Sequence, residues 1–492
     1  MNMLSTRFNK VIIIMLRVLL FIILITSIIM CGATFIGFNL FGTIVITLVL
    51  IISILLEYKI INSNLKLSQK IFYIVLIALI LRVLWLLNAN NVPTSDFATM
   101  YYSAQELLNG NEKILKGINY GARFPHIIGE ILYMAIMQYI FPYYNIIAMK
   151  IVNLILGLLG LLFIYLVASE IIKDEKYAMC ALGIGSVFPP SITYTSVFCS
   201  ENLAMPFYLL SVLIFIKNIN KSRTKGYIFI VSSIVLGIGN IFRMIAIVIL
   251  IAYVIYSIMY LKENILTKLK NIVCIIVPYF LVLLIISTSL QRMNLIENPL
   301  WRGAEPKITS ILKGTNINSL GMWNSEDADI AEKYIGDYNK IESECKRIIY
   351  ERLTTTSHIK LSLFYIAKLS SQWCIGDFAG AFWTQKDLED NKMIFKIGSF
   401  GSLPFQLIYV AILILVIIGL RNKDNNGNLS INLFKLILLG YMGAYLMLEN
   451  QCRYGYIICW VFVILGTDGI NKCLELSKYS KGREYFNLIM KF

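Results

Sequence analysis

The sequence VIIIMLRVLLFIILITSIIMC, residues 11–31, decides the fold class of this chain. An α-helix rises about 1.5 Å per residue, so about 20 apolar residues cross the roughly 30 Å hydrocarbon core of a bilayer. The run follows Arg7 and Lys10, but it is longer than the apolar core of a signal peptide, and a second apolar run begins almost at once. The pattern therefore predicts a transmembrane helix that is retained.

Similar apolar runs recur along the whole chain of 492 residues, of which 58% are hydrophobic and 15% charged. This composition is typical of a polytopic membrane protein and excludes a water-soluble domain. The predicted fold class is an all-α polytopic membrane protein with about twelve transmembrane helices and with external loops that carry interfacial helices. The candidate crossings are residues 11–31, 33–56, 71–88, 146–169, 177–198, 202–217, 226–241, 243–261, 271–290, 401–420, 432–448 and 454–469.

The short apolar segment 127–141 decides the orientation. It carries Glu130 and ends at Pro142, which favours a helix that lies along the membrane interface. With that assignment all short basic loops fall on one side, as cytoplasmic loops should; a thirteenth crossing would reverse the bias halfway along the chain. The net charge of +15 is thus explained by these loops, and no nucleic-acid partner is expected. The loop and tail cations are Lys59, Lys66, Lys70, Lys173, Lys176, Lys217, Lys221, Arg223, Lys225, Lys262, Lys268, Lys270, Arg421, Lys423, Lys478, Lys481 and Arg483.

The opposite side receives two long segments, residues 89–145 and 291–400. A loop of about 110 residues in a compact membrane domain is normally functional. Residues 324–353 are expected to contain surface helices and residues 364–383 an interfacial helix. The predicted organisation is two additional N-terminal helices with a basic loop (1–70), a transmembrane core with the first external loop (71–290), the long external loop (291–400), C-terminal helices (401–470) and a basic tail (471–492).

Motifs for other chemistry are absent from the sequence. The nine cysteines are scattered, with no CxxC pair and no metal-ligand spacing, so neither a disulfide framework nor a zinc site is predicted. No glycine-rich nucleotide-binding motif is visible. The sequence requires no cofactor, although two facing carboxylates would permit a divalent cation.

The passage NNVPTSDFATMYYSAQELLNG, residues 90–110, places an acid just outside a predicted crossing. Asp96 lies in the first turn of a short predicted helix, with Tyr101 and Tyr102 one turn further on. Two interpretations stay open: Ser95 or Asp96 caps the helix, or Asp96 acts in catalysis. The apolar face of this helix is predicted to consist of Phe97, Tyr101, Ala104 and Leu108.

Two further external groups are candidates. GARFPHIIGE, residues 121–130, offers Arg123 and His126, for which a lipid-phosphate contact and an ordinary interfacial hydrogen bond are the alternatives. In SVFPPSITYTSVFCSENLAMP, residues 186–206, two prolines break an apolar run and Glu201 follows. A carboxylate so close to hydrocarbon is a functional candidate, or else the solvated end of a hairpin.

Two arginines lie at the same predicted boundary. Arg243 occupies a tight external turn, and in LENQCRYGY, residues 448–456, the i, i+4 spacing predicts a helical pair of Glu449 with Arg453, for which a purely structural ion pair is the alternative. Together with Asp96 and Glu201 these arginines suggest a site for an anionic, membrane-borne substrate. Arginine suits phosphate because its planar fork donates parallel hydrogen bonds, and a carboxylate can deprotonate a hydroxyl nucleophile.

These passages resemble the polytopic GT-C glycosyltransferases that use polyprenyl-phosphate sugars, which include the protein O-mannosyltransferases (family 39) and the bacterial aminoarabinose transferases. The similar stretches are PTSDFATMYYSAQELLNG, RFPHIIGEILYMAIMQYIFPYYNIIAMKIVNLILGLL, GSVFPPSITYTSVFCSENL and, as in Gram-positive members, GTNINSLGMWN and KLSSQW...DFAGAFW. The resemblance covers roughly residues 71–460. It implies a GT-C-like fold. Many relatives have a second acid directly after the first, where this chain has Phe97.

The resemblance also implies roles for individual residues. Asp96 and Glu201 would be catalytic. The implied substrate-binding residues are Arg123, His126, Arg243, Glu449, Arg453, Tyr101 and Tyr102.

The resulting hypothesis is an inverting glycosyltransferase of a bacterial cytoplasmic membrane, with its active site facing outward. Its partners would be a polyprenyl-phosphate sugar donor, membrane lipid, and an acceptor hydroxyl on an envelope glycan, lipid or protein. A transporter or flippase of lipid-linked intermediates and a polysaccharide polymerase or ligase are the alternatives. Which sugar and which acceptor are used does not follow from the sequence.

Overall fold

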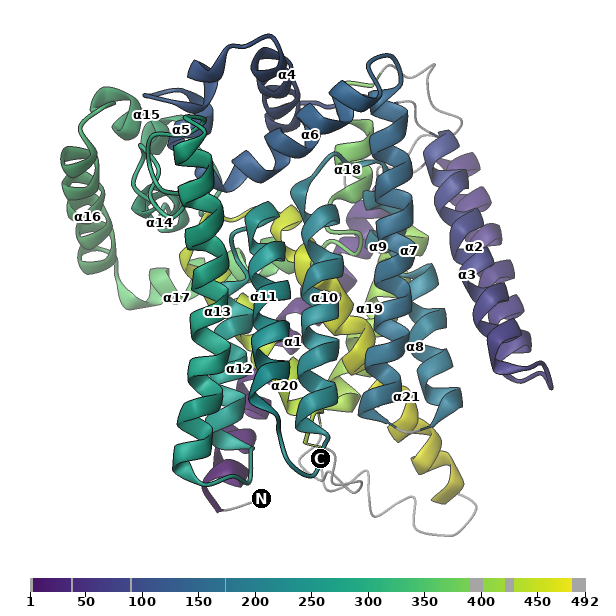
Figure 1. Ribbon diagram of the computed structural model, residues 1–492. Coiled ribbons are helices and arrows are strands. Elements are labelled where there is room, and N and C mark those ends of the chain that lie inside the picture. The colour runs from purple at the N-terminus through teal and green to yellow at the C-terminus, as the bar shows by residue number, and fades with distance from the viewer. Residues whose placement is uncertain are drawn as a thin grey trace.

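The computed structural model describes residues 3–36, 39–88, 91–172, 174–388, 401–420 and 429–479. Within these ranges the regular elements are all helices, arranged as a bundle with smaller helices at one end (Figure 1). The all-α prediction is therefore confirmed. The helices that fall in the predicted crossings are α1 (Met3–Ile36), α2 (Leu40–Ile61), α3 (Leu67–Asn88), α7 (Asn145–Ile171), α8 (Glu175–Val187), α10 (Ser200–Ile219), α11 (Gly226–Phe242), α12 (Ile247–Met259), α13 (Ile265–Arg292), α19 (Leu403–Gly419), α20 (Ile431–Met447) and α21 (Cys459–Tyr479).

Among the described residues, seven helices are long and apolar enough to cross a membrane: α1, α2, α3, α7, α10, α13 and a C-terminal helix over residues 452–474. Four shorter apolar helices, α11, α12, α19 and α20, accompany them. Multiple membrane spans are thus supported by length and composition, and the number twelve stays a prediction.

The predicted crossing 177–198 is not one helix, as its two prolines suggested. Helix α8 ends at Val187, and a short helix, α9 (Pro189–Thr193), and a 3-10 turn, η3 (Tyr194–Ser196), follow before α10 begins. The break arises because proline donates no backbone hydrogen bond and clashes with the preceding turn. The irregular backbone is buried in protein, where Asn153 and Asn202 donate to its carbonyl groups.

The two long external segments lie at the same end of the bundle, opposite the end where α1 begins (Figure 1). Helix α6 (Ile128–Ile140) runs obliquely across that end and is not among the helices that could span, in agreement with an interfacial position. Exposed tyrosines at 139, 143 and 144 follow it, as is typical of a membrane interface. The other elements at this end are α4 (Asp96–Leu108), η1 (Glu112–Leu115), α5 (Tyr120–Arg123), η2 (Pro125–Ile127), α14 (Ile308–Gly314), α15 (Ser325–Lys333) and α16 (Tyr338–Thr355).

The long external loop returns to the bundle through two helices. Helix α17 (His358–Trp373) exposes Ile359, Leu363 and Ile366 on one face, which fits the predicted interfacial helix. Helix α18 (Gly380–Gln385) is separate, so residues 364–383 are not one continuous helix. The predicted loop residues 389–400 lie outside the described residues.

Two charged residues that the sequence analysis did not single out are buried inside the bundle. Arg82 on α3 is 1% exposed and donates to the carbonyl oxygens of Ala78 and Ser186. Glu57 on α2 accepts a hydrogen bond from the Ser186 hydroxyl. These hydrogen bonds to Ser186 tie α2 and α3 to α8. They also give both charged residues partners, and an unpaired charge would be very costly in hydrocarbon.

Candidate functional site

Asp96 begins α4, and its carboxylate is not a helix cap in the usual sense. Ser95 occupies the N-cap position but makes no side-chain capping hydrogen bond, so capping by Ser95 is not supported. Its φ of 52° is rare for a residue other than glycine and costs on the order of 1 kcal/mol. The Asp96 Oδ2 atom lies 3.8 Å from Arg453 Nη2, and half of the Asp96 side chain is exposed. The acid is therefore both paired and accessible.

Arg453 is a buried cation at this end of the bundle. It belongs to the 3-10 segment η5 (Cys452–Ile458) and is 6% exposed. The guanidinium carbon lies 4.8 Å from the ring centre of Phe97 and 4.9 Å from that of Trp383. Its Nε and Nη1 atoms are buried and have no hydrogen-bond partner. Buried donors without partners are unfavourable, so this group is suited to an incoming acceptor.

Glu201 and Arg243 form a second pair at the outer ends of α10 and α11. The Arg243 Nη2 atom lies 3.3 Å from Glu201 Oε1, and Glu201 is 1% exposed. The Arg243 guanidinium carbon is 4.9 Å from the ring centre of Tyr454, and that ring is also 5.5 Å from Arg453. The structure thus brings Asp96, Glu201, Arg243 and Arg453 together, although they are distant in the sequence.

Glu130 joins this cluster, and the sequence analysis did not choose it as a site residue. It lies in the first turn of α6 and is buried, and its Oε2 atom has no partner. Burial and then the charge of Glu201 raise the pKa of Glu130 well above its usual range, against the opposing effect of Arg243 and Arg453. The sequence could have indicated Glu130, because an acid in the apolar stretch 127–141 is rarely buried without a partner or a function.

Gly129 explains how α6 approaches so closely. A Cβ atom at this position would collide with the carbonyl oxygen of Ile241, just before the end of α11. Only glycine permits this contact, which places Glu130 beside the residue that follows α11, Arg243.

Arg123 is engaged with two acids of the second long segment. Its guanidinium donates to Glu305 at 2.7 and 3.0 Å and to Glu332 at 2.6 Å, so it links the first external segment to the second. His126 is exposed, but the surrounding protein and the nearby cations, led by Arg243 and Lys307, lower the pKa of His126 to about 3. With this lowered pKa the imidazole of His126 is neutral at neutral pH.

The remaining predicted residues have other contacts. The Tyr101 hydroxyl donates to Asn145 at 2.8 Å, and Tyr102 is mostly exposed. The predicted helical pair of Glu449 with Arg453 is wrong, because α20 ends at Met447 and η5 begins only at Cys452, so the i, i+4 spacing does not apply. Glu449 lies 3.4 Å from Lys313 instead.

In the described ranges, no group of three or more His, Cys, Asp or Glu side chains could hold a metal ion. Glu201 is also engaged with Arg243. These residues do not fit a divalent-cation site.

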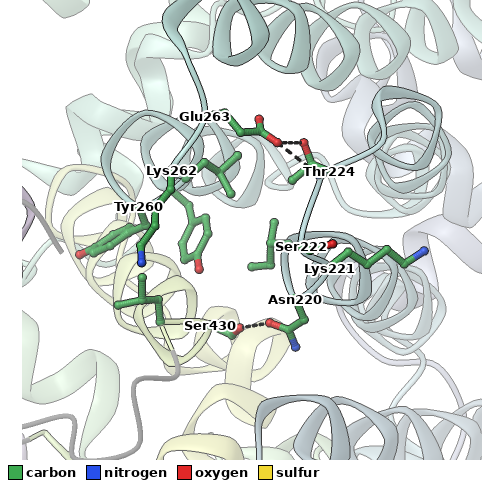
Figure 2. A pocket seen from close by; sticks show the side chains of 12 residues that line it. Asn220, Lys221, Ser222, Thr224, Tyr260, Lys262, Glu263 and Ser430 are labelled. Carbon is green, nitrogen blue, oxygen red and sulfur yellow. Dashed lines mark hydrogen bonds between the residues drawn. The ribbon is translucent and has the colours of Figure 1, made fainter.

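A cavity of about 270 Å³ lies elsewhere, between the α10–α11 and α12–α13 connections and the start of α20 (Figure 2). Figure 2 shows two pairs of its polar side chains bound to each other: the Thr224 hydroxyl donates to Glu263, and the Ser430 hydroxyl donates to Asn220. These contacts join the α10–α11 connection to the α12–α13 connection and to the start of α20. The cavity contains none of the predicted site residues.

Three comparisons with known proteins were made. No curated protein matches this sequence. Among solved structures, the Archaeoglobus fulgidus oligosaccharyltransferase is similar in its apo form, with 13% identity and a TM-score of 0.46, and in its complex with Zn and sulfate, with 13% identity and a TM-score of 0.44. The archaeal oligosaccharyltransferase AglB from Archaeoglobus fulgidus, in complex with an inhibitory peptide and a dolichol-phosphate, is similar with 14% identity and a TM-score of 0.45.

Each of these alignments covers 85% of this chain, but the chain spans only about half of theirs, 51%, 51% and 53%. At such TM-scores the likeness assigns neither fold nor activity. A family model described as dolichyl-phosphate-mannose-protein mannosyltransferase matches residues 131–291, from α6 to the end of α13. Over about a third of its length this chain is therefore similar to the dolichyl-phosphate-mannose-protein mannosyltransferases, which confirms its resemblance to the polytopic GT-C glycosyltransferases.

Proposed function

We propose that this protein is a membrane glycosyltransferase that moves a sugar from a polyprenyl phosphate, such as undecaprenyl phosphate, to a hydroxyl group of an envelope glycan, lipid or protein. The proposed location is the cytoplasmic membrane of a bacterium of the Gram-positive type, with the site on the outer face. The core 71–290 and the two external loops would form the catalytic unit. The family match over residues 131–291 supports the reaction class.

One observation carries the proposal. Arg453 is buried with two unpaired N–H groups, directly beside the half-exposed carboxylate of Asp96. A guanidinium with free donors suits a phosphate oxygen, and a neighbouring carboxylate suits a hydroxyl group. The two groups that the reaction needs therefore lie within 3.8 Å of each other.

The proposed reaction is a direct displacement. Asp96 accepts the proton of the acceptor hydroxyl while the hydroxyl oxygen attacks the anomeric carbon of the donor sugar. The bond from that carbon to the phosphate oxygen breaks, and its electron pair leaves with the polyprenyl phosphate. Arg453 stabilises the charge of the departing phosphate. A single displacement inverts the anomeric centre.

Glu201 has a less direct role in this scheme. Its burial and its contact with Arg243 leave it little access to an acceptor hydroxyl. We assign Glu201 to holding Arg243 beside the phosphate site. Lys307 and Lys313 add positive charge near His126.

The test is donor consumption by the purified full-length protein in lipid nanodiscs, with a small panel of polyprenyl-phosphate sugars and crude envelope acceptors. The parent is expected to consume one donor and release polyprenyl phosphate. Asp96→Asn removes the charge at nearly constant size and should lower turnover by about 10²–10⁴-fold, the usual contribution of a general base. Glu106→Gln, an exposed acid on the same helix, is the matched control. An Asp96→Asn protein as active as the parent would remove Asp96 from the mechanism.

A further inference from the structure

Arg453 packs against two aromatic rings that come from different parts of the chain. Phe97 follows Asp96 on α4, and Trp383 belongs to α18 of the long external loop. Both rings are within 5 Å of the guanidinium carbon, and they touch each other edge to face at 5.4 Å. Both side chains are buried, at 4% and 8% exposure.

We propose that Phe97 and Trp383 are positioning residues that hold the Arg453 guanidinium ready for the phosphate of a lipid-linked donor. The proposal rests on the proposed function, because it assigns the anion that Arg453 binds. It adds a specific device: aromatic rings hold the arginine without occupying its N–H groups.

The physical reason is that a carboxylate and an aromatic ring contact different parts of the guanidinium. A carboxylate would bind the guanidinium through its N–H groups and would compete with the donor phosphate. An aromatic face stabilises the cation through its quadrupole and leaves every N–H group available. The unpaired Nε and Nη1 atoms of Arg453 agree with this arrangement, since only Nη2 approaches an acid, Asp96, at 3.8 Å. Nη1 shares one edge of the guanidinium with Nη2, and such an edge can donate two parallel hydrogen bonds to a phosphate group.

Trp383 is held by contacts that are independent of Arg453. Helix α18 packs against the broken segment between α8 and α10, where Gly380 touches Thr193 so closely that a Cβ atom would collide with it. The Thr384 hydroxyl lies 2.8 Å from that of Ser196. The long external loop thereby contributes a wall of the site, and the break at Pro189 and Pro190 provides the surface on which α18 rests.

The experiment measures binding of undecaprenyl phosphate to the full-length protein in nanodiscs by native mass spectrometry, together with the KM and kcat for the donor. Trp383→Ala is expected to weaken binding about tenfold and to raise KM more than it lowers kcat, because a desolvated cation–π contact contributes about that much. Trp383→Phe should restore most of the affinity. Trp323→Ala is the matched control, since Trp323 is 62% exposed in the same external loop.

The variants separate two failures. If Arg453→Gln loses affinity but Trp383→Ala binds like the parent, the aromatic positioning is overturned and the proposed function stands. If Arg453→Gln itself binds like the parent, the phosphate role of Arg453 is overturned with it. Should Trp383→Ala fail to fold, Phe97→Leu replaces it: this variant keeps an apolar side chain but no π face, and an unchanged affinity would contradict the proposal.

Discussion

The acids at the outer end of the bundle differ most in their access to solvent. Half of the Asp96 side chain is exposed, whereas Glu201 and Glu130 are almost fully buried. A base that receives a proton from an acceptor must reach that acceptor, so access favours Asp96. In the proposed mechanism the buried acids act through the two arginines beside them.

The raised pKa of Glu130 gives a prediction for pH dependence. Burial and the charge of Glu201 keep this acid protonated above the usual carboxyl range. As the pH rises through the raised pKa, a new negative charge competes with the donor phosphate for Arg243 and Arg453. The KM for the donor is therefore expected to rise on the alkaline side. For the same reason the folded state should lose stability between the ordinary and the raised pKa, because it then binds more protons than the unfolded state.

Glu130→Gln tests this prediction because it keeps the neutral form at every pH. Its KM should stay level where that of the parent rises, as measured by donor titrations from neutral to alkaline pH. Glu106→Gln should follow the parent. An alkaline rise that persists in Glu130→Gln would assign it to another group.

At this scale the sequence predicted the four charges that meet and missed what surrounds them. Asp96, Glu201, Arg243 and Arg453 could be chosen because charges at a membrane boundary are costly and therefore informative. The rings of Phe97 and Trp383 could not, because aromatic residues are frequent in this chain and their pairing depends on a contact between distant segments. Phe97, predicted as part of an apolar helix face and noted as the position of a missing second acid, places its aromatic ring against the Arg453 guanidinium.

At the scale of elements, the prolines at 189 and 190 predicted the break between α8 and α10 correctly, since their effect on a helix is local. The pairing of Glu449 with Arg453 failed because it assumed a continuous helix across the end of α20. Helix ends depend on the tertiary contacts of their last carbonyl groups, and spacing alone does not reveal these.

Gly129 offers a test of how α6 is seated. Gly129→Ala would place a methyl group against the carbonyl of Ile241 and push α6 away from the end of α11. Overpacking of this kind costs about 1–3 kcal/mol. We expect a lower thermal unfolding midpoint and reduced kcat, measured on the purified variant in detergent.

Gly443 provides the control for this substitution. It lies in α20, and nothing lies within 4 Å of the position of an added Cβ atom. Gly443→Ala should be neutral or slightly stabilising, because alanine favours a helix over glycine. Equal midpoints for the two variants would show that the contact at Gly129 is unimportant.

At the scale of the whole molecule, Lys368 joins the external loop to the bundle. Its side chain is fully buried on α17, and its Nζ atom donates to the carbonyl oxygens of Gly314, Leu446 and Leu448 at 2.6, 2.8 and 2.7 Å. One ammonium group thereby fixes α14 against the chain that leads from α20 to Arg453.

Lys368→Met would leave these three carbonyl oxygens without their donor. Each buried group without a partner costs about 1–3 kcal/mol, so a loss of about 3 kcal/mol or more is expected in the free energy of unfolding. Chemical denaturation and limited proteolysis of the external loop would measure it. Lys360→Met, an exposed lysine on the same helix, should have almost no effect. A Lys368→Met protein as stable and as resistant as the parent would contradict this role.

The packing of α1 has a consequence for how the chain is made. Arg17 donates to the carbonyl oxygen of Leu420, 403 positions further on. At roughly 5–20 residues per second, the ribosome needs roughly 20–80 s to supply that partner. Until then a nascent α1 has to keep a guanidinium in the bilayer unaided. A photo-cross-linker at Leu16 should therefore capture lipid or insertion machinery in chains stalled before residue 403, and α19 in finished chains; the same products in both would show that α1 docks early.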